Sequence, residues 1–339
     1  VLVLRRQQVA VLALGGPEQA DRTGRIGAAG LCAPQDVVAA VESLAATDDL
    51  EDEAGRLDAA PPPVPETVGR VVAVWGPAGA PGRTTTAIAL AAELAARGRP
   101  TLLLDVDPGG GTVAQRLGIL DEVSGLLVVA RRANTGTLDR ETFTAACRTA
   151  AAGLGVLTGL PRADRRIEVR PEVVTGLIAT AGTCGDVVLD TGAGLGSESD
   201  DRDRMTTEAL TAADEVVVVG QADPVGLARL ARGLVELDEL CGPVPVRVVV
   251  NRMRPSLGWA PGAVADLVAT YAPTGRPVPV HLVVDDPAAL DRCLVGGLSL
   301  VEAGSSAARK GWAEVARACF PTAFVEPGRS AGRRRRERR

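Results

Sequence analysis

Residues 77–86 read PAGAPGRTTT and stand between an apolar run at 71–76 and a helical stretch. In a phosphate-binding loop, backbone N–H groups and a helix N-terminus hold phosphate oxygens, a basic side chain reaches the terminal phosphates and a hydroxyl binds Mg²⁺. The alternative is an ordinary strand-to-helix turn in which Thr84 is the helix N-cap. The residues predicted to line a phosphate site are Gly79, Ala80, Pro81, Gly82, Arg83, Thr84 and Thr85.

Acidic residues end two further apolar runs. TLLLDVD (101–107) contains Asp105 and Asp107, and DVVLD (186–190) ends in Asp190. A carboxylate at such a strand end is suited to orienting a water for attack on a γ-phosphate or to holding a hydrated Mg²⁺. The alternative is a polar strand end that caps the next helix. Asp105 and Asp107 would point to the same face unless the strand breaks between them.

From residue 70 onward, apolar runs alternate with helical stretches. Several runs are apolar at almost every position, as strands buried on both faces of a parallel sheet are. The alternation predicts an α/β fold with a doubly wound, mostly parallel sheet, in which ligands bind beyond the carboxyl ends of the strands. The loop and the carboxylates would therefore converge on one site. The predicted strands are 71–76, 101–107, 154–160, 186–190, 215–220, 246–251 and 280–284.

Four regions are predicted along the chain. Residues 1–46 contain short apolar runs and helical stretches typical of a βα fragment. Residues 47–69 combine an acidic run with several prolines and are predicted to be a linker. Residues 70–322 would form the α/β domain, and residues 323–339 a basic, disordered tail.

Charge and composition exclude several classes of function. The 339-residue chain has a formal net charge of −5, but residues 329–339 contribute +6, which leaves −11 elsewhere. An acidic body argues against nucleic-acid binding across the folded surface. Aromatic residues make up 2% of the chain, too few for an aromatic platform that stacks nucleobases. Weak contact of the basic tail with anionic lipid or DNA stays open as an alternative to simple disorder.

We expect no metal site built from Cys and His, no disulfide framework and no membrane-spanning helix. The six cysteines show no metal-ligand or redox spacing, and the only histidine, His281, lies in a predicted strand, where a structural role is expected. The chain shows no secretory signal and no run of about 18 apolar residues. We therefore expect a cytoplasmic protein, with any membrane contact peripheral.

Three segments together resemble a known group: GPAGAPGRTTTAIALAAELAARGRPTLLLDVD, DVVLDTGAG and VRVVVNRM. They resemble the deviant P-loop ATPases of the MinD/ParA superfamily over about residues 70–320. More narrowly, they are similar to CpaE-like proteins of pilus assembly and to the septum-site-determining proteins of actinobacteria. Residues 8–46 look like the latter part of the receiver domain of CpaE-like proteins. The early strands that carry phosphorylatable aspartates have no counterpart, so phosphorelay signalling is not expected.

The resemblance implies ATP and Mg²⁺ as ligands. It places Thr84 on Mg²⁺, Asp107 at the hydrolytic water, Asp190 as the Walker B acid and Asn251 at the adenine. Asp105 joins Thr84 and Asp190 as a candidate near the metal. The resemblance also implies a homodimer with protein partners in the division or pilus machinery.

The sequence departs from the family pattern at three positions. Ala78 stands where the family has its signature lysine, and Arg83 replaces the P-loop lysine, which keeps the charge but not the compact ammonium geometry. Pro81 has no backbone N–H to offer a phosphate. We therefore expect nucleotide binding without fast hydrolysis.

Three functions are compatible with these residues. The first is a CpaE-like, ATP-dependent dimeric switch that acts in septum-site determination or Flp/Tad-type pilus assembly. The second is a degenerate pseudo-ATPase scaffold, as Ala78, Pro81 and Arg83 indicate. The third is a ParA-type DNA-partitioning factor, whose DNA affinity would fall steeply with salt.

Overall fold

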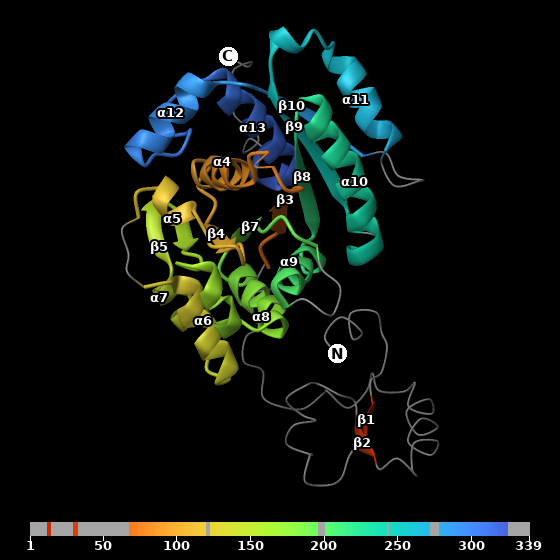
Figure 1. Ribbon diagram of the computed structural model, residues 1–339. Coiled ribbons are helices and arrows are strands. Elements are labelled where there is room, and N and C mark those ends of the chain that lie inside the picture. Colours follow the sequence, from red (N-terminus) through yellow and green to blue (C-terminus); the bar gives the residue numbers. More distant parts are fainter. Residues whose placement is uncertain are drawn as a thin grey trace, which may run out of the picture. The chain divides into compact units, whose positions relative to one another are not determined.

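The computed structural model describes residues 12–14, 30–32, 68–79, 81–119, 123–195, 201–242, 244–271 and 278–324 (Figure 1). The chain divides into two compact units, Val1–Pro65 and Glu66–Arg339, and the division falls inside the predicted linker. Ala80, most of the linker and the tail beyond Phe324 lie outside the described residues. Every helix of the described ranges is too short or too polar to span a membrane.

In the first unit, two short strands pair in parallel. They are β1 (Leu12–Leu14) and β2 (Gly30–Cys32), with Leu12 opposite Gly30. Both lie within the apolar segments of the predicted βα fragment. The rest of residues 1–46 lies outside the described part, so the receiver-like interpretation stays a prediction.

The second unit is built on an eight-stranded sheet with the order β10-β9-β8-β3-β7-β4-β6-β5. Every neighbouring pair is parallel except β5 with β6. The predicted doubly wound, mostly parallel sheet is therefore confirmed. The strands are β3 (Val71–Trp75), β4 (Thr101–Val106), β5 (Arg148–Ala151), β6 (Leu154–Leu157), β7 (Asp186–Thr191), β8 (Glu215–Gln221), β9 (Val246–Met253) and β10 (Val280–Val284).

Each of the seven predicted strands is present, and the eighth, β5, was not predicted. Its sequence RTAA is short, half-exposed and without an apolar run, so it carries no strand signal of its own. It becomes a strand by pairing antiparallel with β6 at the edge of the sheet.

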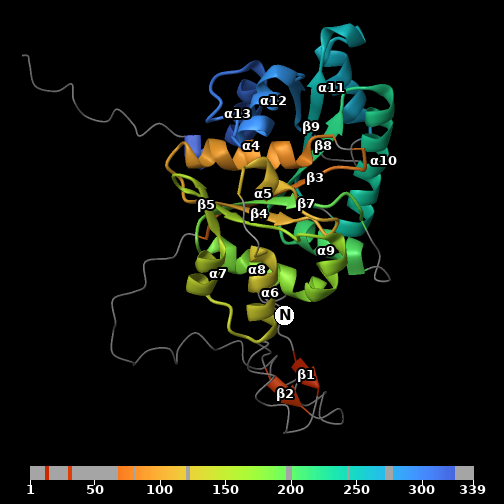
Figure 2. The same cartoon turned by 60° about the vertical axis from the view of Figure 1, so that its left-hand side comes forward.

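Helices connect the strands and cover both faces of the sheet. Figure 2 shows α4, α12 and α13 on one side of the sheet and α6, α7 and α8 on the other. The α-helices are α4 (Arg83–Ala95), α5 (Val113–Arg116), α6 (Gly125–Asn134), α7 (Arg140–Ala146), α8 (Pro171–Gly182), α9 (Asp201–Thr211), α10 (Pro224–Cys241), α11 (Pro261–Thr270), α12 (Pro287–Gly296) and α13 (Ala307–Cys319). Short 3₁₀ helices are η3 (Ala163–Glu168), η4 (Pro255–Leu257) and η5 (Pro321–Phe324).

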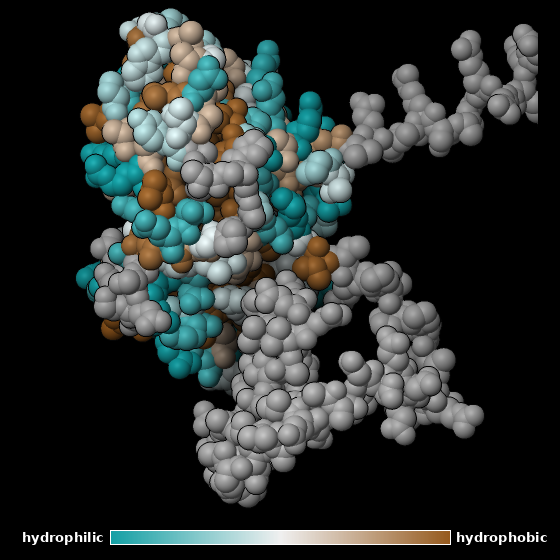
Figure 3. All heavy atoms as spheres, turned by 90° about the vertical axis from the view of Figure 1, so that its right-hand side faces the viewer, coloured by the Kyte–Doolittle hydropathy of each residue, from teal (hydrophilic) through white to brown (hydrophobic). Residues whose placement is uncertain are grey.

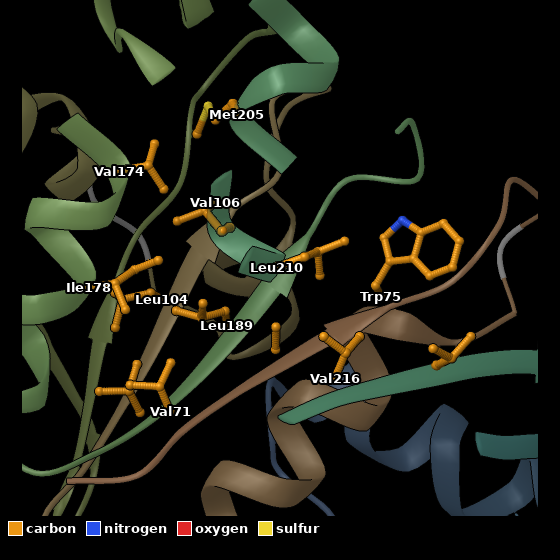
Figure 4. Packing of buried hydrophobic residues seen from close by; sticks show 14 of the residues in the cluster. Val71, Trp75, Leu104, Val106, Val174, Ile178, Leu189, Met205, Leu210 and Val216 are labelled. Atoms are coloured by element: carbon orange, nitrogen blue, oxygen red, sulfur yellow. The ribbon is translucent and has the colours of Figure 1, made fainter. Parts of the chain in front are cut away.

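Alternate residues of each central strand enter different cores. In β3, Val71, Ala73 and Trp75 pack on one face, whereas Val72 and Val74 pack on the other. Figure 4 shows the first face, where Val174 and Ile178 of α8 lie over the strands near Leu104 and Leu189. Burial on both faces explains why β3 is apolar throughout, because no side chain of the strand reaches water.

Helix α4, which follows the loop after β3, is fixed by α13. The indole Nε1 of Trp312 donates to Thr86 Oγ1 at 3.1 Å, inside the core. Arg309 Nε lies 2.7 Å from Glu93 Oε1, and the Glu93 side chain is 4% exposed. Trp312, Val315 and Cys319 of α13 are all buried.

The Glu93–Arg309 pair predicts a stability effect. Replacing Arg309 with methionine leaves a buried carboxylate without its partner, and we expect the free energy of unfolding to fall by about 3 kcal/mol. Urea unfolding measures it. The control is Lys310→Ala, an exposed residue of the same helix, for which we expect a change below about 0.5 kcal/mol. Equal effects of both variants would contradict the assignment.

Candidate nucleotide site

The loop between β3 and α4 has the shape that its glycines allow. Gly79 and Gly82 have φ angles of 117° and 105°, which favour glycine. Helix α4 begins at Arg83 with Gly82 as its N-cap, so Thr84 is the second residue of the helix. The alternative in which Thr84 is the N-cap is therefore wrong. The hydroxyls of Thr84 and Thr85 stand on the first turn of the helix instead.

Side chains from three elements bind the carbonyl oxygens of this loop. Arg83 Nη1 donates to Gly76 O at 3.1 Å and to Pro77 O at 3.3 Å. Asn251 Nδ2, from β9, donates to Pro81 O at 2.8 Å. The third donor is Arg229 of α10, whose Nη1 lies 3.4 Å from Ala78 O. Two of these three donors, Asn251 and Arg229, thus come from distant parts of the sequence.

Asn251 is buried and joins the loop to β9. A Cβ on Gly82 would lie 2.4 Å from its Nδ2, so only glycine fits there. Its Oδ1 accepts from the backbone N–H of Arg252 at 2.8 Å, and Arg252 has a φ of 61°. The structure therefore shows Asn251 holding the loop, and its contact with adenine stays a prediction.

Asp105 and Asp190 lie opposite each other on neighbouring strands. The register pairs Asp105 of β4 with Asp190 of β7, and Val74 of β3 lies on the other side of Asp190. Both carboxyl groups are almost fully buried. Two acids this close in an apolar sheet disfavour each other's charge.

The Asp105 carboxyl is directed at backbone. Its Oδ2 accepts from Val113 N at 3.0 Å and its Oδ1 from Asp107 N at 3.4 Å. A Cβ on Gly111 or Gly159 would lie within 2.1 or 2.6 Å of this carboxyl, so both positions need glycine. Burial raises the pKa of Asp105 to about 7, against the backbone hydrogen bonds that lower it. Asp105 thereby anchors the 107–113 loop.

Asp190 has a free oxygen. Burial, and then the charge of Asp105, raise the pKa of Asp190, while a hydrogen bond with Thr84 and the charge of Arg83 lower it. Its Oδ1 is buried and has no hydrogen-bond partner among the described residues. A carboxylate and a hydroxyl together, with one carboxylate oxygen unpartnered, are the donors that a hydrated Mg²⁺ requires. The residues present fit the ion.

Asp107 lies just beyond the end of the strand that carries Asp105. Strand β4 ends at Val106, so the break that the sequence left open occurs between the two acids. Asp107 Oδ1 accepts from Gly109 N at 2.7 Å, and a Cβ on Gly192 would lie 3.2 Å from the same oxygen. Asp107 lines a polar cavity of about 160 Å³ together with Arg83, Pro108, Gly109, Gly110, Gly192, Ala193, Gly194 and Asp203.

Helix α9 contributes two residues that the sequence did not single out. A Cβ on Gly194 would lie 2.0 Å from Asp203 Oδ1, which places this carboxylate against the segment after β7. The buried Thr206 Oγ1 has no partner among the described residues and would lie 2.9 Å from a Cβ on Gly192. The polar sequence of α9 did not mark Asp203 or Thr206 as site residues, because only the fold brings this helix to the strand ends.

A second cavity, of about 360 Å³, begins at helix α4. It runs from Thr85 and Ile88 of α4 past Arg252 and Asp285 to Leu290 of α12. Arg116 Nη1 lies 3.3 Å from Thr85 Oγ1 at its edge. Its mixed polar and apolar lining, continuous with the loop helix, suits a base and sugar beside the phosphates.

A third cavity, of about 450 Å³, lies between α10 and α11 and has a different character. Its lining, which includes Leu227, Trp259 and Tyr271, contains no charged side chain. Figure 3, viewed from the α10 and α11 side, shows hydrophobic side chains exposed among hydrophilic ones. Such a lining does not suit a phosphate.

The described residues contain no group of three or more His, Cys, Asp or Glu side chains placed to hold a metal alone. A Mg²⁺ held by one carboxylate, one hydroxyl and nucleotide phosphates needs no such group. His281 Nε2 lies 3.2 Å from Arg247 Nη1, and burial and that charge lower the pKa of His281. It is distant in sequence from the loop and packs in β10.

No protein-family model matches this sequence. A stretch of 65 residues is 46% identical to the chromosome partitioning protein ParA of Myxococcus xanthus (strain DK1622). This stretch spans 19% of the chain and about a quarter of the relative's length, 23%.

Solved structures resemble the second unit more widely. The cell division ATPase MinD of Pyrococcus furiosus has a TM-score of 0.61 at 21% identity, over 75% of this chain and 99% of that one. The Chlorobium tepidum ParA family ATPase has a TM-score of 0.62 at 19% identity, over 74% and 98%. The septum site-determining protein MinD of Pyrococcus horikoshii, complexed with Mg-ADP, has a TM-score of 0.61 at 19% identity. The match covers 76% of this chain and 98% of that one. The chain has the fold of the MinD/ParA P-loop ATPases.

The raised pKa of Asp105 predicts a pH dependence of stability. Between pH 3.8 and about 7, the folded chain keeps the Asp105 proton, whereas the unfolded chain has released it. Stability should therefore fall as pH rises through this window, by up to about 1.4 kcal/mol per pH unit, and level off above it.

Urea unfolding of Asp105→Asn at pH 4.5 to 8 measures this contribution as a difference from the unmodified chain. The variant should show a smaller decrease between pH 4.5 and 7. Asp266→Asn, an exposed residue of α11, is the control and should keep the original slope. Parallel curves for the chain and Asp105→Asn would refute the assignment.

Proposed function

We propose that this chain binds ATP with Mg²⁺ and acts as a positioning protein of the MinD/ParA type. One observation carries the proposal: the loop before α4, the Thr84–Asp190 pair with its unpartnered oxygen, and Asp107 gather at one edge of the sheet. The MinD/ParA fold supports it, because solved neighbours include MinD complexed with Mg-ADP and a Cyanothece McdA–ATP complex.

Each site residue has a role in this proposal. The backbone of residues 79–84 and the Arg83 guanidinium bind the phosphates, with Thr85 beside them. The Thr84 hydroxyl and, through water, Asp190 hold Mg²⁺, with Asp105 positioning the loop behind them. The ion neutralises phosphate charge when bound. Asp107 orients a water near the terminal phosphate, and Asn251 and Arg252 lie where the base would enter.

We expect slow hydrolysis. Pro81 cannot donate a backbone N–H to a phosphate, and Ala78 carries no charge. Arg83 spreads its charge over a planar guanidinium and is engaged with Gly76 O and Pro77 O. Binding depends on the loop as a whole, whereas hydrolysis depends on charge placed against the transition state. The departures therefore affect turnover more than affinity.

We propose that ATP makes the chain a homodimer, and that the dimer acts on the division or pilus machinery in the cytoplasm. A MinC:MinD complex among the structural neighbours is one cell-division assembly of this fold. The CpaE-like resemblance of the sequence points to septum-site determination or Flp/Tad-type pilus assembly. The basic tail, rich in arginine, is suited to weak contact with an anionic membrane or DNA.

Titration calorimetry with ATP and Mg²⁺ tests the proposal. We expect binding in the micromolar range that Arg83→Ala weakens by roughly 100-fold, because a cation hydrogen-bonded to phosphate is removed. Arg132→Ala, on the exposed surface of α6, is the control and should bind as the unmodified chain does.

Absence of binding by the unmodified chain would contradict the proposal. Phosphate release, followed in the same samples, tests hydrolysis. Release that disappears in Asp107→Ala would exclude the pseudo-ATPase alternative. Binding with no release would favour that scaffold.

Size-exclusion chromatography with light scattering tests the switch. With ATP and Mg²⁺ we expect the mass of a dimer, and with ADP or no nucleotide the mass of a monomer. Asp190→Asn, which removes a charge from the metal position, should stay monomeric with ATP. One unchanged monomer mass in all three conditions would refute a nucleotide-dependent dimer.

A further inference from the structure

Arg229 lies against the phosphate-binding loop although it comes from another part of the chain. Its Nη1 is 3.4 Å from Ala78 O, across 151 residues of sequence. A Cβ on Gly79 would lie 2.2 Å from the same nitrogen, so the guanidinium rests on the Gly79 backbone. Figure 2 shows the loop after β3 reaching towards α10, which carries this arginine.

Helix α10 is held tightly, so this placement is a feature of the fold. Asp223 caps the helix, accepting from Gly226 N at 2.7 Å. A Cβ on Gly226 would lie 2.4 Å from Gln221 O, and one on Gly233 would lie 3.0 Å from the Trp75 ring. These glycines bring the helix close to β8 and to the end of β3. The first two turns of α10 therefore have little freedom to move away from the loop.

The guanidinium of Arg229 lies in a salt bridge with none of the acids of the described residues. Among the described residues, no ion pair includes Arg229, and its one hydrogen bond goes to Ala78 O. The guanidinium borders a cavity of about 320 Å³ between the loop and α10, lined also by Ala78, Gly79 and Asp223. The Asp223 carboxylate is engaged with Gly226 N and Gln221 Nε2. Its remaining N–H donors are available to an anion at the loop.

Arg229 stands beside the position that lacks a basic residue. Ala78 has no charge, and the only lysine of the chain, Lys310, is in α13. The other cation of the loop, Arg83, is bound to Gly76 O and Pro77 O. A second cation at Ala78 and Gly79 raises the positive potential where phosphates would lie.

We propose that Arg229 supplies the second cation of the phosphate-binding loop and binds the terminal phosphates of a nucleoside triphosphate. The inference rests on the proposed function, since it assigns a residue to that nucleotide site. A guanidinium presents paired N–H donors that match phosphate oxygens. Its charge acts more strongly on a triphosphate than on a diphosphate, because the triphosphate is more negative. Arg229 is thus a residue that favours ATP over ADP.

The experiment measures the affinity for ATP and for ADP, each with Mg²⁺, by calorimetry. We expect Arg229→Ala to weaken ATP binding roughly tenfold and ADP binding less, so that the ATP:ADP preference falls. The control is Arg232→Ala, an exposed arginine three residues further along α10, which should leave both affinities unchanged. The double variant Ala78→Lys/Arg229→Ala should recover most of the ATP affinity, because the lysine restores a cation at the loop.

The outcomes separate the two proposals. If the unmodified chain binds neither nucleotide, the proposed function fails and the inference fails with it. If the unmodified chain binds ATP but Arg229→Ala binds ATP and ADP each as tightly as the unmodified chain does, the inference alone is overturned. If Arg229→Ala loses both affinities equally and Ala78→Lys does not restore them, Arg229 only braces the loop, which also overturns the inference. Thermal unfolding without nucleotide checks that each variant is folded.

Discussion

The paired carboxyl groups of Asp105 and Asp190 are the constraint on which this site depends. They occupy register positions opposite each other on β4 and β7, inside a sheet whose buried side chains are mostly apolar. Two such groups are tolerated only where backbone N–H groups, a hydroxyl or a cation compensate for lost water. Asp105 has Val113 N and Asp107 N, and Asp190 has Thr84. Asp105 is therefore bound to backbone, whereas Asp190 keeps one oxygen without a partner among the described residues.

The loops around this pair follow from it. Asp105 fixes the segment that leads from Asp107 to Val113, and Gly111 and Gly159 let that segment approach without a side chain in the way. Asp107, just beyond the strand, lines the cavity that also contains Arg83. The two acids therefore have different surroundings, because Asp105 is buried among backbone N–H groups, although the sequence places them in the same run.

The loop between β3 and α4 keeps its shape through side chains of several elements. Arg83, Asn251 and Arg229 donate to four of its carbonyl oxygens from α4, β9 and α10. Carbonyls bound from outside leave the backbone N–H groups free to face a ligand. Behind the loop, α4 is fixed by Trp312 and Arg309 of α13. The loop therefore depends on tertiary contacts on every side.

The sequence by itself determined the sheet, the helices between its strands and the place of the loop. Apolar runs such as DVVLD are typical of strands buried on both faces of a parallel sheet, and this run forms β7. The tertiary structure alone decided the rest. Strand β5 exists only through β6, and β4 ends between Asp105 and Asp107. Arg229 contacts Ala78 O across 151 residues of sequence. A local pattern of apolar residues predicts which face of a segment is buried, whereas contacts across 100 residues or more form only when the chain is folded.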